Sequence, residues 1–275
     1  MNVCCSIVAA ALLVLATGAR AQEPVSVDPM HAALDGVLDI YVRDGLVYYQ
    51  ALRQERGRLD RYVASLSGVR TDGWSEKRRL AFWINAHNAL VLRSVIDNYP
   101  IRGRADMYPR NSLRQVSGAF EKRPFRVAGQ TLTLDEIEKD VIVPLGDARA
   151  LLALGRGAVG GGRLRSEAYT EARLDQQLDS AVADAVDNRE LVFVDSVNNV
   201  ISLNPVFSWR EQAFVDGFAG AAPEEFARRS PLERAVLGLI MPHLVQTEKD
   251  ALEANDFKMT FHEFDWTLND LTNRR

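Results

Sequence analysis

The chain of 275 residues is 47% hydrophobic and 25% charged, a balance that suits a folded protein with a sizeable core and excludes a disordered one. Its net charge of −4, with no block of Lys and Arg interleaved with aromatic residues, argues against nucleic acid as a partner. No linker rich in Pro, Ser or Gly divides the chain, so residues 22–275 are expected to form a single globular domain.

The first predicted element is a signal peptide at residues 1–21. A wholly apolar run at 7–16 leads to Ala19-Arg20-Ala21, the small-x-small pattern that signal peptidase cleaves, so the mature chain should begin at Gln22. The run is shorter than the roughly 20 apolar residues of a transmembrane helix, so no stable membrane insertion is expected after cleavage. These features predict a soluble protein that is periplasmic or secreted by a bacterium.

Both cysteines belong to this signal. Cys4 and Cys5 precede the apolar run and would leave with it. The mature chain would then have no disulfide, no thiol nucleophile and no thiolate metal ligand.

Helices dominate the first part of the mature chain. Apolar residues at helical spacing predict a helix over 34–41, ended by Gly45, and a second helix is expected over 51–66. Ser75 is a suitable N-cap for a third, which extends to Asn98. Because this third helix is apolar nearly all round, we expect it to be buried at the centre of the fold.

The middle of the chain mixes hairpins with short helices. Hairpins are predicted at 125–132 and 191–203, with a helix over 171–186 between them. Thr133 and Glu136 form the pattern of a capping box, which predicts that a short helix starts directly after the first hairpin.

The C-terminal part begins with a well-specified helix start at Ser230-Pro231-Leu232-Glu233, and Pro242 should kink that helix. A final strand is expected within 257–264. The order of elements predicts an α+β fold in which a central buried helix and other helices pack on a mostly antiparallel sheet of short strands and hairpins.

Several segments, in order along the chain, carry a family resemblance. Residues 82–90 read FWINAHNAL, and five further motifs are DGLVYY at 44–49, LDEIE at 134–138, EAYT at 167–170, LNPVFSW at 203–209 and DWTLND at 265–270. Together they resemble the bacterial and plant family called domain of unknown function 547, over about 41–270. The family has no assigned activity, so the resemblance implies a fold rather than a reaction.

Departures from the family pattern bear on chemistry. Where the family carries a His and two Cys, this chain has Leu151, Arg156 and Gly161. If those family residues perform chemistry, this member has lost it, which favours a degenerate, non-catalytic protein. The other departures are Tyr48 for Asp, His87 for Tyr, Lys139 for His, Arg210 for Tyr and Ala213 for Asp.

The glycine-rich segment 155–162 has three interpretations. Its start fits the G-x-G-x-x-G spacing of a dinucleotide-binding turn, but further glycines follow where that turn requires a helix. Alternatively, its backbone amides together with Arg156, Arg163 and Arg165 would bind a phosphate or carboxylate. The interpretation that we favour is a flexible relic loop whose arginines are simply solvated.

Polar residues on the buried helix raise a second question. Asn85, His87 and Asn88 lie where an unpaired polar group costs about 1–3 kcal/mol. They either line a pocket beside Glu138 and Trp209 or form a satisfied structural network, and the network is the commoner outcome.

No catalytic or metal motif is present. The chain has no HExxH, no pair of histidines at i and i+4 and no G-x-S-x-G, so neither a metal nor a cofactor is predicted. Our first hypothesis is a non-catalytic binding or accessory protein for a small molecule or protein partner. The alternative is a cysteine-independent hydrolase or transferase that uses Glu138 or His87 as its acid-base group.

Overall fold

The computed structural model describes residues 28–272, so the expected signal peptide and cleavage site lie outside the described residues. The helices are α1 (Ala32–Tyr41), α2 (Tyr49–Gln54), α3 (Gly57–Ser65), α4 (Glu76–Asn98), α5 (Leu134–Glu136), α6 (Ala150–Ala153), α7 (Leu174–Asp187), α8 (Val206–Trp209), α9 (Glu211–Phe218), α10 (Pro231–Ile240) and α11 (Gln246–Glu253). The strands are β1 (Val42–Arg43), β2 (Leu46–Val47), β3 (Phe125–Val127), β4 (Gln130–Leu132), β5 (Val192–Asp195), β6 (Val200–Leu203) and β7 (Lys258–Phe261).

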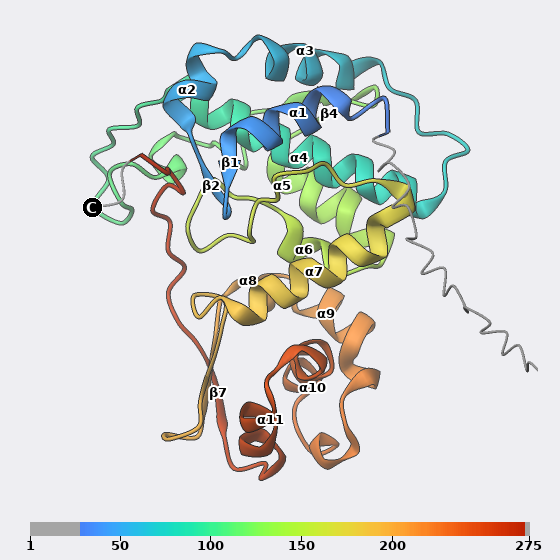
Figure 1. Ribbon diagram of the computed structural model, residues 1–275, viewed down its shortest axis with the longest axis vertical. Coiled ribbons are helices and arrows are strands. Elements are labelled where there is room, and N and C mark those ends of the chain that lie inside the picture. The colour runs from blue at the N-terminus through green and yellow to red at the C-terminus, as the bar shows by residue number, and fades with distance from the viewer. Residues whose placement is uncertain (1–27, 273–275) are drawn as a thin grey trace, which may run out of the picture.

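Helix α4 is the central helix that the sequence predicts. The side chain of Ser75 accepts a hydrogen bond from the amide of Arg78 and so caps its first turn. The helix is buried around its circumference from Leu80 to Ile96, interrupted only at Arg93. Figure 1 shows α1 to α3 on one side of α4, with α6 and α7 on the other. The α+β class and the central helix are therefore confirmed.

The helix predicted over 51–66 is instead two helices. Helix α2 ends at Gln54 and α3 begins at Gly57. The polar run 53–58 between Leu52 and Leu59 is mostly exposed, and it provides no packing that would hold one continuous helix.

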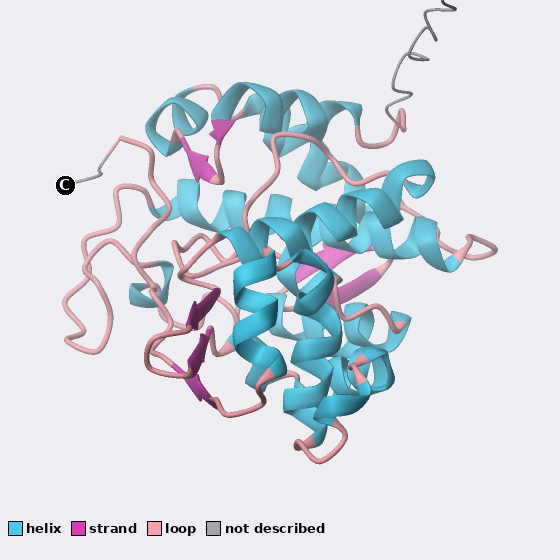
Figure 2. Cartoon of the chain, turned by 60° about the horizontal axis from the view of Figure 1, so that its bottom comes forward, coloured by secondary structure: helices cyan, strands magenta, loops and turns pink. Residues whose placement is uncertain are grey.

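The strands form three separate small sheets rather than one (Figure 2). The predicted hairpins are confirmed as the antiparallel pairs β3–β4 and β5–β6. The final strand β7 joins the second hairpin in parallel, with Met259 opposite Ile201. This parallel pairing is the exception to the antiparallel expectation, and it arises because the chain returns to β6 through α8 to α11.

Helix α10 starts with the predicted capping box between Ser230 and Glu233. It ends at Ile240 rather than continuing through a kink at Pro242, because a proline cannot continue the backbone hydrogen bonds of the helix. The buried apolar residues of all these elements form one continuous core. Within residues 28–272, no helix is both long and apolar enough to cross a membrane.

Candidate functional site

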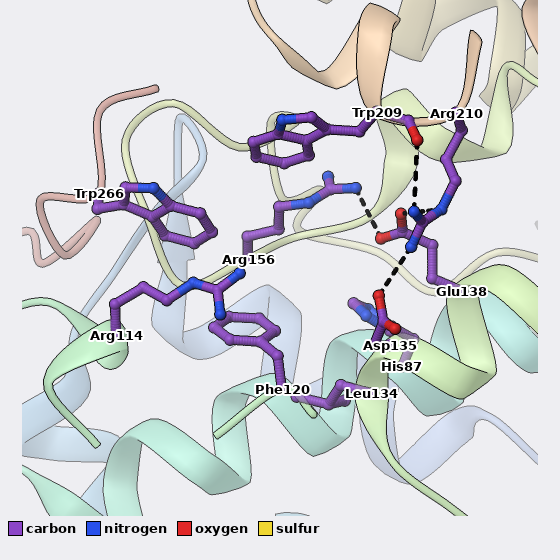
Figure 3. Close-up of a pocket in the computed structure, with 10 residues that line it drawn as sticks. All are labelled: His87, Arg114, Phe120, Leu134, Asp135, Glu138, Arg156, Trp209, Arg210 and Trp266. Atoms are coloured by element: carbon purple, nitrogen blue, oxygen red, sulfur yellow. Dashed lines mark hydrogen bonds and ion pairs between the residues drawn. The ribbon is translucent and has the colours of Figure 1, made fainter. Parts of the chain in front are cut away.

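A pocket of about 260 Å³ opens beside the middle of α4. It lies between α4, the segment that follows β4 and the C-terminal part of the chain (Figure 3). Its lining residues come from well-separated parts of the sequence and are His87, Arg114, Phe120, Leu134, Asp135, Glu138, Arg156, Trp209, Arg210 and Trp266.

Glu138 forms the buried ionic centre of this pocket. It lies on a π-helical segment, Ile137–Ile142, that continues from α5. Such segments are rare in proteins as a whole, and those that occur are often found at functional sites. Nη2 of Arg156 donates to Oε2 of Glu138 over 2.7 Å, and Nε of Arg210 lies 3.2 Å from Oε1. Burial alone would raise the pKa of Glu138, but Arg156, together with His87 and Arg210, outweighs it and holds that pKa below its ordinary value. Glu138 is therefore ionised at neutral pH.

His87 lies on α4 and is almost completely buried. Burial lowers the pKa of His87 to about 4, although the nearby Glu138 carboxylate opposes the shift. The imidazole is therefore neutral at pH 7. Its Nδ1 has no hydrogen-bond partner, which is unusual for a buried ring nitrogen.

Aromatic side chains hold Arg114 in place at the other end of the pocket. Its guanidinium carbon lies 4.5 Å from the ring centre of Phe120 and 4.4 Å from that of Trp266. Trp266 in turn stacks nearly parallel to Trp209, with an angle of 14° and a centroid distance of 6.0 Å. The cation-π contacts and the stack fix the guanidinium plane before any ligand arrives.

Asp135 belongs to the site as well as to the helix start. It lies in the first turn of α5, where a carboxylate suits the helix dipole. Its Oδ1 also accepts a 2.7 Å hydrogen bond from Nη2 of Arg210. The capping box itself is confirmed, since Thr133 and Glu136 bond each other's backbone amides.

Of the five predicted pocket residues, three meet in the pocket and two do not. His87, Glu138 and Trp209 line it. Asn85 instead binds the backbone of Tyr169 twice, donating to its carbonyl over 2.8 Å and accepting from its amide over 2.9 Å.

Asn88 makes the same kind of clamp. It donates to the carbonyl of Ala153 over 3.1 Å and accepts from the amide of Gly155 over 2.8 Å. Asn85 and Asn88 thus form the satisfied structural network that the sequence analysis favours for buried amides.

The expectation of a flexible, solvent-exposed glycine loop is wrong. Residues 155–162 are buried, except that Val159 is half-buried. A Cβ at Gly162 would lie 1.8 Å from the carbonyl oxygen of Leu152, and one at Gly160 would lie 2.9 Å from the backbone of Asp265. These glycines allow close packing of backbone on backbone, and no helix opens at Gly160 as a dinucleotide-binding turn requires.

The three arginines in and just after this segment do not converge on one anion. Arg156 is buried and pairs with Glu138, so it is not solvated as the relic-loop interpretation requires. Arg163 pairs with Asp44 and Asp184 at 2.8 Å each, on a surface that does not include the pocket. Arg165 lies on that same surface, where its partners are Glu167 and Asp184.

Six lining residues were not predicted as part of a site: Arg114, Phe120, Leu134, Asp135, Arg210 and Trp266. Leu134 and Trp266 lie within motifs that carry the family resemblance, and those motifs could have marked them as site residues. Arg114 and Phe120 lie in a long irregular segment between α4 and β3, where no periodicity marks a functional position.

Three departures from the family pattern meet here. His87, Arg156 and Arg210 all line the pocket, whereas Leu151 and Gly161 are buried elsewhere. No curated protein and no solved structure matches the chain. Residues 71–184, which include α4, Glu138 and Arg156, match the family described as protein of unknown function, DUF547. This match covers less than half of the chain and agrees with the resemblance carried by the motifs at 82–90, 134–138 and 167–170.

Proposed function

We propose that this chain is an exported binding protein whose pocket holds a small polar molecule without transforming it. The observation that carries the proposal is the commitment of Glu138 to two arginines. Its carboxylate bonds Arg156 at 2.7 Å and lies 3.2 Å from Arg210, so it serves as a fixed counter-ion. The pocket volume of about 260 Å³ lies just below the roughly 300–1,000 Å³ common for drug-sized ligands and suits a smaller one.

Acid-base chemistry has weak support from the same groups. A general acid or base works best when its pKa lies near the operating pH. The pKa of Glu138 is shifted downward, away from neutrality, and burial sets the pKa of His87 at about 4. A carboxylate with a raised pKa would have favoured an enzyme, and the direction here is the opposite.

The test compares two aromatic side chains of equal exposure. Trp209 and Tyr48 are both 38% exposed, and only Trp209 lines the pocket. The low-molecular-mass fraction of an extract from the producing cells is the probe, and the melting temperature is the readout. Saturating ligand at about 100 times its Kd stabilises the native state by roughly 2.7 kcal/mol. We expect a shift in the wild type and in Tyr48→Ala that is lost in Trp209→Ala.

Mass spectrometry of the bound molecule completes this test. Its mass should stay unchanged during long incubation with the protein. A time-dependent product would instead support the hydrolase or transferase alternative. No shift with any fraction would contradict the binding function.

Export is the second part of the proposal, and it is supported by the apolar run and small-x-small site in the sequence. The intact mass of protein isolated from the producing cell should correspond to a chain that begins at Gln22. A mass that includes Cys4 and Cys5 would contradict export with cleavage.

A further inference from the structure

The charges of the pocket walls do not balance. Three guanidinium groups line the pocket, from Arg114, Arg156 and Arg210, against two carboxylates, from Asp135 and Glu138. Arg156 and Arg210 bond to those two carboxylates. Arg114 is therefore the lining arginine without a carboxylate partner among the pocket walls, and it accounts for the unbalanced positive charge.

The existing partner of Arg114 lies outside the pocket. Nη1 of Arg114 pairs with Glu121, whose side chain is 46% exposed. Because the Glu121 side of this pair is open to water, which screens its attraction, a ligand carboxylate can compete with Glu121 for the guanidinium. Nε of Arg114 is buried and has no hydrogen-bond partner, although the rings of Phe120 and Trp266 already hold the guanidinium in place.

The opposite side of the pocket sets a limit on ligand charge. Figure 3 shows Asp135, Glu138 and His87 across the pocket from Arg114. The two carboxylates would repel a second negative charge on the ligand, whereas they accept hydrogen bonds from hydroxyl or N–H groups. Trp209, Trp266 and Leu134 add apolar surface to the pocket wall.

We propose that the pocket selects a small organic monocarboxylate, whose carboxylate pairs with Arg114 and whose body lies against the indole rings. This inference rests on the proposed binding function and names its ligand class. A carboxylate fits the planar fork of a guanidinium and supplies one charge, which matches the single unbalanced cation. A dianionic phosphate monoester would bring one charge too many.

Three probes of similar shape separate charge from shape: phenylacetate as monoanion, phenylacetamide as neutral isostere and phenyl phosphate as dianion. Calorimetric titration at pH 7.5 and fixed ionic strength measures each Kd, so that general screening is the same for all. We expect phenylacetate to bind at least about tenfold more tightly than either of the others, a factor that corresponds to roughly 1.4 kcal/mol.

Two variants and a control locate the preference. Arg114→Gln should abolish the advantage of phenylacetate over phenylacetamide. Glu121→Gln removes the competing carboxylate, leaves the aromatic stack intact and should tighten phenylacetate binding several-fold. Arg70→Gln changes an exposed arginine outside the pocket and should leave all three Kd values as in the wild type.

The outcomes distinguish this inference from the binding function itself. Equal binding of phenylacetate and phenylacetamide, both lost in Trp209→Ala, would overturn the charge preference and leave the binding function standing. Tighter binding of phenyl phosphate would overturn it too, as would unchanged binding in Glu121→Gln. If no probe binds while the extract still shifts the melting temperature, the monocarboxylate class is wrong. If the extract also has no effect, both proposals fail.

Discussion

Nη2 of Arg156 lies 2.7 Å from Oε2 of Glu138, and the two side chains are only 4% and 9% exposed. Each charge has lost most of its water and depends on the other for compensation. Arg156 also donates from Nη1 to the backbone carbonyls of Leu151 and Leu154, at 3.4 Å and 3.2 Å. The ion pair therefore links the π-helical segment to the glycine-rich segment and sets the shape of the pocket wall.

Removing either member of this pair should be costly. We expect Glu138→Gln or Arg156→Met to lower the free energy of unfolding by about 3–5 kcal/mol. The first leaves the buried Arg156 without a carboxylate partner, and the second leaves the buried Glu138 with Arg210 alone. The double variant should lose clearly less than the sum of the two. Urea denaturation of the four proteins measures this coupling.

The exposed pair Lys77–Asp175, with side chains 58% and 57% exposed, is the control for this cycle. Lys77→Met should change the stability by no more than about 1 kcal/mol. Additive losses from Glu138→Gln and Arg156→Met would show that the two charges are independent and that the buried pair is not intact in solution.

Acidification should weaken the fold through two buried histidines. Burial lowers the pKa of both His31 and His87 from 6.5 to about 4. Above pH 6.5 both histidines are neutral in the folded and in the unfolded chain. Between pH 6.5 and 4 they bind protons in the unfolded chain but stay neutral in the folded chain. Stability should therefore fall as the pH drops through this window, by up to about 1.4 kcal/mol per pH unit for each histidine.

Protonation of Glu138 should cause a further loss of stability at lower pH. Because its pKa in the fold is lowered, its ionised form stabilises the protein above the unfolded pKa of about 4.3 and is lost as the pH falls through the lower folded value. Urea denaturation from pH 8 to 3 checks both contributions, the histidines above pH 4 and Glu138 below it. His31→Gln and His87→Gln should each flatten the slope between pH 6.5 and 4, and an unchanged slope in both would contradict the burial of these rings.

Gly162 should tolerate no side chain. In Gly162→Ala the new Cβ would meet the carbonyl oxygen of Leu152 at 1.8 Å, so the backbone must move, at a cost of about 1–3 kcal/mol or more. Gly68 has no atom within 4 Å of the corresponding position. Gly68→Ala should be neutral or stabilise by up to about 1 kcal/mol. Equal melting temperatures for the two variants would mean that the segment is not packed as described.

Asn85→Ala should destabilise the protein by about 1–3 kcal/mol, because it strands both the amide and the carbonyl of Tyr169 in the interior. Asn98 lies on the same helix, is half-buried and makes one hydrogen bond, to the carbonyl of Ser94. Asn98→Ala is the control and should cost clearly less. Chemical denaturation measures both, and a change within about 0.5 kcal/mol for Asn85→Ala would contradict its placement.

Local signals made much of this fold predictable. The cap at Ser75, the capping boxes at Thr133 and Ser230 and the hairpins depend on residues a few positions apart, and the structure confirms all of them. The parallel pairing of β7 with β6 joins strands separated by several helices, and no pattern within either strand encodes it.

The site was only partly predictable for the same reason. His87 and Glu138 stand in recognisable motifs, whereas Arg114 enters the pocket from an irregular segment. The glycines of 155–162 were misjudged because glycine suits both a mobile loop and a tight backbone contact. Only the positions of Leu152 and Asp265 distinguish the two, and both contacts are tertiary.

The two asparagine clamps on α4 have a consequence for amide hydrogen exchange. Asn88 holds the amide of Gly155 and Asn85 holds that of Tyr169, so both ends of the segment between them are fastened to one buried helix. Neither amide can meet solvent through a local opening that leaves α4 in place. Both should therefore exchange only with the slowest, global unfolding of the protein, and a glycine-rich stretch would belong to its most protected cooperative unit.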